Sequence, residues 1–271
     1  MRARFPTLPC CLLGLTLLGP APNPVRSDPA PAPPPAAPGK FHVFLLVGQS
    51  NMAGRAAIEP EDAAPRENVF LWNAPEKRWE PALPPYNRHS PHGKDAAMQK
   101  LNLGPSFARA WRESHPDIAV GIVCMARGGT AIAEWEKGRQ KNWPLYDTAV
   151  AETREALKAG GELKAILWHQ GESDAKRLDA YPDRLKALVE NFRADLSAPS
   201  APFVFGQAGR FNADYAGFNA MILEQPKAIP HTAVATTEGL KAIDSAHFDT
   251  IGQRELGRRY AAALENLLKR P

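Results

Sequence analysis

The 271-residue sequence is poor in cysteine, and this scarcity excludes a fold held together by disulfides. Of its three cysteines, Cys10 and Cys11 lie in an apolar stretch near the N-terminus, so the rest of the chain cannot form an intrachain disulfide. Only Cys124 remains, and it falls inside an apolar run. This setting favours a buried thiol that packs as a small apolar side chain over a reactive one.

The sequence also lacks an excess of charge of one sign. Its 33 basic and 29 acidic side chains give a formal net charge of +4. Three of the arginines and one aspartate lie in the first 39 residues, so residues 40–271 carry 30 basic and 28 acidic side chains and a net charge of +2. Because no basic run offers a surface for phosphates, we expect no nucleic-acid partner.

A long apolar segment is missing as well. The best candidate, residues 5–18, is broken by two prolines and is shorter than the roughly 20 apolar residues that cross a bilayer. Since two arginines precede it and small residues follow it, we expect residues 1–27 to be a signal peptide, with candidate cleavage sites near Ala21 and near Ser27. The protein is then secreted or periplasmic, without stable membrane insertion; a retained N-terminal anchor is the alternative.

Proline and alanine, by contrast, are abundant after that segment and make up 14 of the 20 residues 20–39. Such a composition builds no core and favours an extended spacer. We therefore expect a linker at residues 28–39 and one folded domain at residues 40–271. That length, with 44% hydrophobic and 23% charged residues overall, is ample for a sizeable core.

In this domain short apolar runs alternate with amphipathic segments. The apolar runs predict five strands, at residues 41–47, 119–125, 163–168, 203–205 and, more weakly, 232–236. Apolar residues at helical spacing predict helices at residues 107–113, 145–158, 181–196 and 256–268. Continuous apolar strands between amphipathic helices are typical of a doubly wound α/β domain, so we predict a mostly parallel sheet of about five strands.

In such folds ligands bind outside the carboxyl ends of the strands. The first predicted strand ends in residues 48–54 (GQSNMAG), which place Ser50 at that edge. There the serine either caps a following helix or presents its hydroxyl and N–H to a ligand, with a helix N-terminus that favours developing negative charge. The G-x-S-x-G elbow is absent, because only Gly48 fits that pattern.

Two further strands end in unusual loops. Gly128 and Gly129 follow the second, where paired glycines either form a tight turn or let the backbone approach a ligand. Residues 168–174 (WHQGESD) follow the third. In this segment Gln170 is a candidate amide donor to an oxyanion and Glu172 a candidate partner of a base, although solvated residues around a helix cap are equally compatible with the pattern.

Asp244 and His247 precede the last predicted helix. An aspartate three residues before a histidine can accept from Nδ1–H and leave Nε2 free to take a proton from a serine. The other histidines have no acidic residue or further metal ligand at a suitable spacing, so they predict neither a metal site nor a cofactor. They are His42, His89, His92, His115 and His231. Serine, glycines, amide and Asp/His pair, in this order at successive strand ends, together form a constellation for acyl transfer.

These blocks, GQSNMAG, GGT-x-I-x-x-W, WHQGESD and D-x-x-H, resemble those of the SGNH-hydrolase superfamily. The variant is the sialate O-acetylesterase (SASA) domain, also grouped as carbohydrate esterase family 6, which includes acetylxylan esterases. The resemblance covers residues 41–268. It implies a flavodoxin-like three-layer α/β/α sandwich and a serine esterase, free of metal and cofactor, that removes acetyl groups from a carbohydrate.

By the same resemblance, Ser50 is the nucleophile and His247 the general base. The oxyanion hole would comprise the N–H groups of Ser50 and Gly129 and the side chain of Gln170. Asp244 is favoured as the triad acid, with Glu172 as the alternative. Three further residues of the blocks are expected to bind substrate: Gln49, Asn51 and Trp135.

Two other functions compete with an acetylxylan-like esterase. One is an esterase for another small acyl ester, such as O-acetylated sialic acid; a lipase is disfavoured, since residues 73–102 are polar and rich in proline. The other is a non-catalytic carbohydrate-binding module that stacks sugars on aromatic rings, for which the candidates are Trp72, Trp79, Tyr86 and Trp135. The intact blocks favour catalysis. The expected partner is an acetylated carbohydrate, and no protein partner is evident.

Overall fold

The computed structural model describes Met1 and residues 37–270. The expected signal peptide and most of the expected linker lie outside these residues and stay predictions. No helix within the described residues is long and apolar enough to cross a membrane.

The centre of the domain is a seven-stranded sheet in the order β3-β2-β4-β1-β5-β6-β7. All neighbouring strands are parallel except β2 and β3, which form an antiparallel pair at one edge. The strands are β1 (Phe41–Gly48), β2 (Val69–Asn73), β3 (Arg78–Pro81), β4 (Ala119–Ala126), β5 (Glu162–His169), β6 (Phe203–Gly206) and β7 (Thr232–Ala235). The predicted mostly parallel α/β sheet is therefore confirmed, but the expected count of about five was too low because it omitted β2 and β3.

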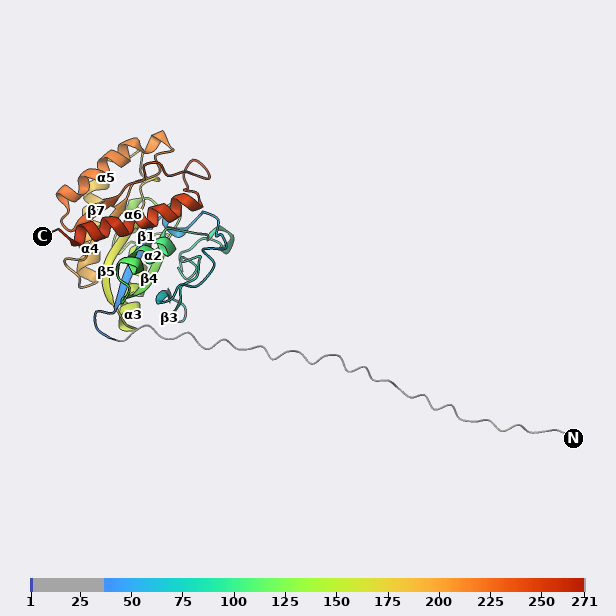
Figure 1. Cartoon of the computed structure of the whole chain (residues 1–271). Coiled ribbons are helices and arrows are strands. Elements are labelled where there is room, and N and C mark those ends of the chain that lie inside the picture. Colours follow the sequence, from blue (N-terminus) through green and yellow to red (C-terminus); the bar gives the residue numbers. More distant parts are fainter. Residues whose placement is uncertain (2–36, 271) are drawn as a thin grey trace. The chain divides into compact units, whose positions relative to one another are not determined.

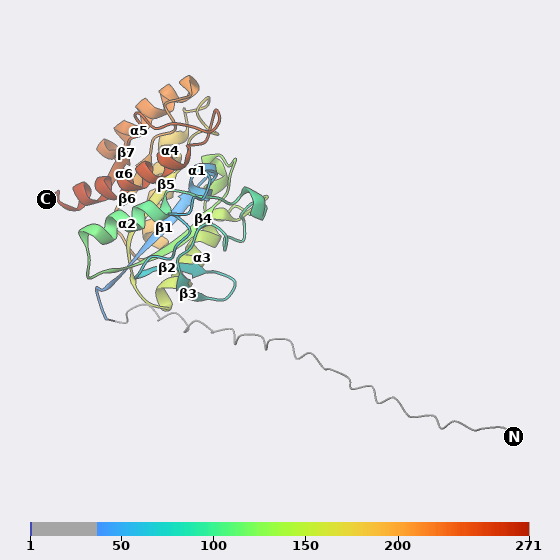
Figure 2. The same ribbon diagram turned by 45° about the vertical axis from the view of Figure 1, so that its right-hand side comes forward.

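Helices cover both faces of this sheet (Figures 1 and 2). The α-helices are α1 (Ser50–Ala53), α2 (Gly104–Ser114), α3 (Leu145–Lys158), α4 (Tyr181–Asp195), α5 (Ala216–Ala228) and α6 (Thr250–Leu268). Short 3₁₀ turns lie at η1 (Ala96–Met98), η2 (Ile132–Trp135) and η3 (Ala213–Tyr215). One core cluster joins the sheet to α3, α4 and α5, and the other joins it to α1, α2 and α6, so the layers form an α/β/α sandwich.

The central strand β1 explains why its sequence is apolar at nearly every position. Val43 and Leu45 belong to the first core cluster, whereas Phe44 and Leu46 belong to the second. Side chains of a strand alternate between faces, so a strand covered on both sides needs apolar residues at consecutive positions. Burial of this strand fixes the position of the loop that follows it.

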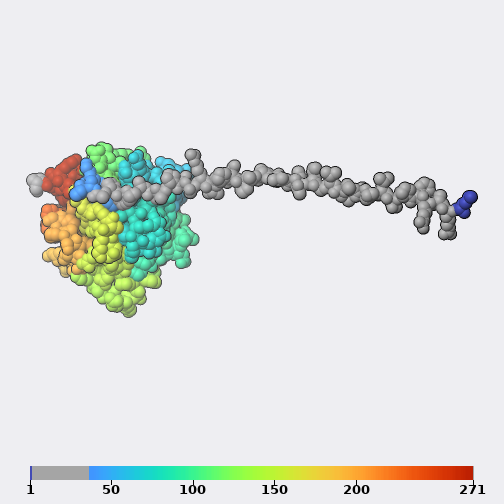
Figure 3. Space-filling view, turned by 90° about the horizontal axis from the view of Figure 1, so that it is seen from below, coloured from blue at the N-terminus to red at the C-terminus, as the bar shows by residue number. Residues whose placement is uncertain are grey.

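The segment between β2 and α2 folds back along α3, and Figure 3 shows the two side by side. Glu152 of α3 accepts hydrogen bonds from Trp72 Nε1 at 3.0 Å and from Lys77 Nζ at 2.5 Å. His92 Nε2 lies 2.8 Å from Thr148 Oγ1. The polar, proline-rich loop expected from the sequence is thereby fixed against α3.

Candidate active site

Three neighbouring parallel strands bring the sequence blocks together. In the register of the sheet, Gly48 at the end of β1 pairs with Ala126 of β4 and with His169 of β5. The carboxyl ends of the three strands therefore coincide, and the loops that follow them begin at the same edge. This edge is the position at which open α/β sheets bind their ligands.

Ser50 lies two residues after the end of β1 and is 6% exposed. The N-cap of α1 is Gln49, so Ser50 is not the helix cap, and α1 has only four residues. One helical turn has a small dipole, and we therefore assign little electrostatic weight to its N-terminus. Within residues 37–270, neither the N–H nor the hydroxyl of Ser50 has a hydrogen-bond partner, and both remain available to a ligand.

The two glycines after β4 serve different purposes. Gly129 has a φ of +81°, a left-handed conformation that favours glycine, and its N–H donates to no acceptor among the described residues. Gly128 has no positive φ. A Cβ there would collide with Arg55 Nη2 and would lie 3.3 Å from Ser50 Cβ. Glycine at position 128 therefore lets the loop after β4 pack closely against both Ser50 and the guanidinium of Arg55.

Gln170 connects the three loops. Its Nε2 lies 3.1 Å from Gln49 Oε1, 3.0 Å from the carbonyl of Thr130 and 2.6 Å from Asp174 Oδ2, while its Oε1 accepts from the Tyr181 hydroxyl at 2.9 Å. The two hydrogens of this amide are thus shared among three protein acceptors. The expected role as oxyanion donor stays a prediction, and in this geometry it requires Gln170 to give up one of those bonds.

His247 and Asp244, the expected base and acid, are in direct contact. Asp244 Oδ2 lies 2.8 Å from His247 Nδ1, and Asp244 Oδ1 accepts from the N–H groups of Ala246 and His247, each at 2.8 Å. Partial burial favours the neutral carboxyl, but these hydrogen bonds outweigh it and hold the pKa of Asp244 below its ordinary value. The carboxylate is therefore ionised at neutral pH and orients the imidazole.

Asn51 and Glu172 lie behind this pair rather than in contact with a ligand. Asn51 is fully buried; it donates to Glu172 Oε1 at 2.6 Å and to the carbonyl of Ala246 at 3.0 Å, and accepts from the N–H of Phe248 at 3.2 Å. The expectation that Asn51 binds substrate is corrected, because its amide holds both neighbours of His247. Glu172 makes no hydrogen bond to His247 within the described residues.

Glu172 instead pairs with a buried histidine. Its Oε1 lies 3.6 Å from His169 Nε2. Burial alone would raise the pKa of Glu172, but the neighbouring His169 and the hydrogen bond from Asn51 lower it overall. Glu172 therefore contacts Asn51 and His169 and lies behind the Asp244–His247 pair, where it supports the structure.

The aromatic side chains weighed as sugar platforms are core residues. Trp72, Trp79, Tyr86 and Trp135 are 1%, 8%, 2% and 0% exposed. Trp135, expected to bind substrate, instead packs edge-on against Trp168 and donates to Thr130 Oγ1 at 3.2 Å, since its ring is needed to support the loop after β4. The stacking surface of a binding module is therefore not formed by these residues.

Sequence reasoning missed Arg55, which is 8% exposed and lies against Gly128. Its Nη1 donates to the carbonyls of Gly54 and Met98 at 2.6 and 2.8 Å. The only signal in the sequence was an arginine placed directly after the glycine that ends the first block. The sequence alone gives no reason to expect a functional role at this position, because only the fold brings the Arg55 side chain near Ser50.

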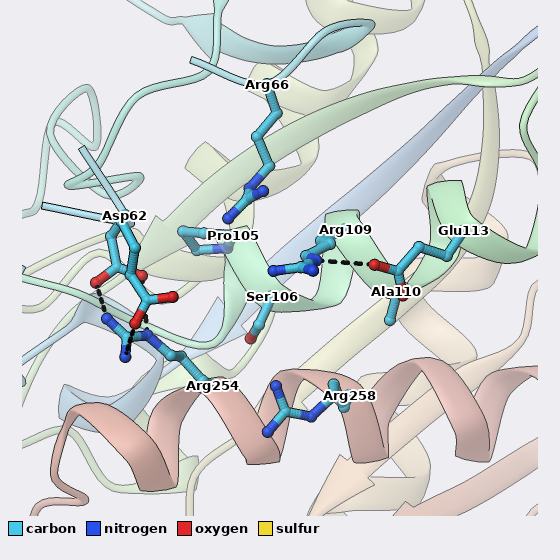
Figure 4. Close-up of a pocket in the computed structure, with 10 residues that line it drawn as sticks. Asp62, Arg66, Pro105, Ser106, Arg109, Ala110, Glu113, Arg254 and Arg258 are labelled. Carbon is cyan, nitrogen blue, oxygen red and sulfur yellow. Dashed lines mark hydrogen bonds and ion pairs between the residues drawn. The ribbon is translucent and has the colours of Figure 1, made fainter. Parts of the chain in front are cut away.

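Other candidate groups lie apart from this edge or are inert. Cys124 is buried in β4, as predicted, and burial raises the pKa of its thiol to about 12. A hollow between α2 and α6 contains Arg66, Arg109, Arg254 and Arg258, shown in Figure 4, but none of the block residues lines it.

Comparisons with known proteins identify the family of this chain. Residues 40–266 match the family described as carbohydrate esterase, sialic acid-specific acetylesterase. A probable carbohydrate esterase of Arabidopsis thaliana, At4g34215, is 38% identical over 60% of this chain, and the match spans 66% of that relative. Its crystal structure superposes with a TM-score of 0.71 at 30% identity, covering 83% of this chain and 98% of that one.

Two more distant structures share the fold alone. NanS is 18% identical with a TM-score of 0.65, over 86% of this chain and 99% of that one. XAC1771, a carbohydrate acetylesterase of Xanthomonas citri, is 22% identical with a TM-score of 0.60, over 83% of this chain and 56% of that one. The family match spans nearly all of the folded domain, so the resemblance inferred from the blocks is confirmed: the chain belongs to the SASA family of carbohydrate esterases.

Proposed function

We propose that this chain is an exported serine esterase that removes acetyl groups from an acetylated polysaccharide or oligosaccharide of the xylan type. The observation that carries the proposal is the Asp244–His247 pair at 2.8 Å. Asn51 donates to the carbonyl of Ala246, which precedes His247, and itself directly follows Ser50, whose hydroxyl and N–H have no hydrogen-bond partner among residues 37–270. The family match supplies the carbohydrate ester as the class of substrate.

Acylation begins when His247 Nε2 takes the proton of Ser50 Oγ. The oxygen lone pair forms a bond to the acetyl carbonyl carbon, and the C=O π electrons move to the oxygen, where the N–H groups of Ser50 and Gly129 donate to the negative charge. The bond to the sugar oxygen then breaks, and His247 returns the proton to that oxygen. No hydrogen bond joins Ser50 and His247 in the described residues, so we expect this contact to tighten when substrate binds.

Deacylation repeats these steps with water. His247 takes a proton from the water molecule, whose oxygen bonds to the acetyl carbon of acetyl-Ser50. When the tetrahedral intermediate collapses, the bond to Ser50 Oγ breaks, the proton returns to Oγ and acetate leaves. Asp244 accepts from Nδ1–H in both halves and stabilises the imidazolium.

A substrate contact is assigned to Gln49. Its Oε1 accepts from Gln170 Nε2 and, at 3.3 Å, from the N–H of Ser173, which fixes the amide in place. Its Nε2 donates to no acceptor among residues 37–270, and Gln49 directly precedes Ser50 in the chain. An amide N–H at this position suits a sugar hydroxyl or the acetyl carbonyl.

An esterase for O-acetylated sialic acid is the second candidate, and two cations favour it. Lys94 Nζ would lie 3.9 Å from a Cβ on Gly129, and Arg127 precedes the two glycines. Neither has an ion-pair partner in the part of the chain that the structure describes. Unpaired cations at the rim of the site suit a substrate with a carboxylate.

The experiment that tests the function measures acetate release from acetylated xylan by purified residues 40–271. Ser50→Ala and an EDTA-treated sample are run in parallel. We expect release that is unaffected by EDTA and falls by at least about 10³-fold in the variant, the order of the loss when a triad nucleophile is removed. Ser50-dependent turnover of 4-nitrophenyl acetate and O-acetylated sialic acid without release from xylan would favour the second candidate. No turnover of any ester would contradict esterase function.

A further inference from the structure

Arg55 is a buried cation without a buried anion. It is 8% exposed, and it forms no ion pair among the described residues. Only Nη1 is engaged, with the carbonyls of Gly54 and Met98. Burial lowers the pKa of Arg55 from its ordinary value, yet a guanidinium stays protonated in proteins. Burying a charge is costly unless it is paired, so its position needs an explanation.

The unbonded end of this guanidinium points at the catalytic edge. A Cβ on Gly128 would collide with Nη2 and would lie 3.3 Å from Ser50 Cβ, so Nη2 and Ser50 lie on either side of the same point. The loop therefore has glycine where any side chain would separate the arginine from the serine. Nη2 donates to no acceptor within residues 37–270, so this nitrogen is free to bond a ligand beside Ser50.

A second buried arginine shows what a structural role looks like in this fold. Arg193 is 7% exposed and has no ion-pair partner among the described residues. Its Nε donates to the carbonyl of Ala201, and its Nη2 to those of Pro230 and His231, at 2.9 to 3.0 Å. This guanidinium bridges chain segments with three bonds at the opposite end of the sheet. Among the described residues Arg55 makes two such bonds, both from Nη1, and Nη2, the nitrogen nearer Gly128, makes none.

The oxyanion hole also has room for a further donor. Two neutral N–H groups, those of Ser50 and Gly129, are free, whereas the Gln170 amide is shared among Gln49, Thr130 and Asp174. A charged donor roughly doubles the strength of a hydrogen bond to an oxyanion. In a site closed to water it acts where charge develops in the transition state.

We propose that Arg55 is a catalytic residue of the esterase, whose Nη2 donates to the tetrahedral oxyanion formed on the acetyl carbonyl. This inference rests on the proposed serine mechanism. The carbonyl oxygen is neutral in the ester and carries a full negative charge once Ser50 Oγ has bonded to the carbon, so the interaction strengthens during the step. No proton leaves Arg55. The same contact forms again in deacylation, before acetate departs.

The test compares Arg55→Met and Arg55→Lys with the wild-type domain, residues 40–271. We expect Arg55→Met to lower kcat for 4-nitrophenyl acetate on the order of 10²–10³-fold, as for other donors to oxyanions, with KM changed less than threefold. Methylboronic acid, which forms a negatively charged tetrahedral adduct with serine, should lose affinity by a similar factor. Arg55→Lys retains the charge and should lose less of both.

Arg193→Met is the matched control, since it removes a buried arginine far from the site. It should lower Tm but leave kcat and boronate affinity of the folded enzyme within threefold. If folded Arg55→Met behaves like this control, or if it loses kcat while boronate affinity is unchanged, Arg55 has no direct role. If Arg55→Met does not fold, Arg55→Gln, which also removes the charge, takes its place, and unchanged kcat and boronate affinity in that variant are the overturning result. A wild-type domain without Ser50-dependent turnover removes the proposed function and this inference together.

Discussion

Two neighbouring residues after β1 have different roles: Ser50 is the proposed nucleophile, and Asn51 supports the loop that carries His247. Ser50 faces the open edge, whereas Asn51 is buried and holds the carbonyl of Ala246 and the N–H of Phe248. His247 lies between those two bonds. The base is thus positioned by its own backbone as much as by Asp244, and Glu172 acts on it only through Asn51.

This division predicts unequal effects for the two acids. Asp244→Asn should lower kcat by 10²–10⁴-fold, on the order seen when a triad aspartate is replaced, because asparagine holds the wrong imidazole tautomer. Glu172→Gln keeps an acceptor for Asn51 and should cost less than tenfold. Steady-state rates with 4-nitrophenyl acetate would decide; equal losses in the two variants would make Glu172 part of the chemistry.

The sequence blocks indicated which residues meet at this edge of the sheet, but they did not indicate the contacts that those residues make there. Ser50, Gly129, Gln170 and the Asp244–His247 pair all meet at one edge, as the order of the blocks indicated. The hydrogen bonds of Gln170 and the approach of Arg55 were not predictable. Both depend on which atoms meet across the sheet, and no local pattern encodes those contacts.

At the scale of the elements, the packing of α6 against α2 is unusually close at one point. A Cβ on Gly257 would collide with Ser106 Oγ and the carbonyl of Leu103, and would lie 2.7 Å from the N–H of Phe107. Ser106 faces α6 from α2, as Figure 4 shows. Two of these obstacles are backbone atoms, so the helices would have to move apart.

Gly257→Ala should therefore destabilise the domain. Alanine improves helix propensity by about 1 kcal/mol, but overpacking of a tight contact costs about 1–3 kcal/mol, and the immovable backbone makes the clash the larger effect. Gly217→Ala in α5 is the control: a Cβ there meets only Leu178 Cδ1, at 3.4 Å, and should stabilise by up to about 1 kcal/mol. Urea unfolding measures both, and stabilisation by both variants would contradict the argument.

The elements missed by the sequence analysis give weak local signals. Strand β3 has one buried side chain, Trp79, in four residues, and the short apolar run of β2 stands directly before a polar, proline-rich segment. Helix α5 carries Pro226 in its last turn and has no clear apolar stripe. By contrast, β1 and β4 are buried at eight consecutive positions and β5 at its last five, and such apolar runs are hard to mistake.

At the scale of the whole molecule, acid should weaken the fold through His42 on β1. This histidine is 7% exposed; burial above all, together with the charges of Lys164 and His115, lowers its pKa to about 4, although Glu162 lies 3.5 Å away. The folded protein binds this proton less readily than the unfolded chain, with its pKa of about 6.5. Stability is therefore complete above pH 6.5 and is lost as the pH falls towards 4.

The loss amounts to about 2 kcal/mol between pH 7 and pH 5, on the basis of about 1.4 kcal/mol for each pKa unit. His42→Gln cannot titrate, so the difference in unfolding free energy between the wild type and this variant should change by that amount over the interval. Parallel curves for the wild type and His42→Gln would contradict the prediction.

The central place of β1 has a consequence for the order of assembly. Val43 pairs with Gly121 on one side and with Leu163 on the other, so the first strand made by the ribosome waits for partners synthesised much later. His247 arrives later still. Because the proposed nucleophile, Ser50, and the proposed base, His247, come from opposite ends of the domain, we expect catalytic competence to be a late event in folding, so that regain of activity would report that the entire sheet has formed.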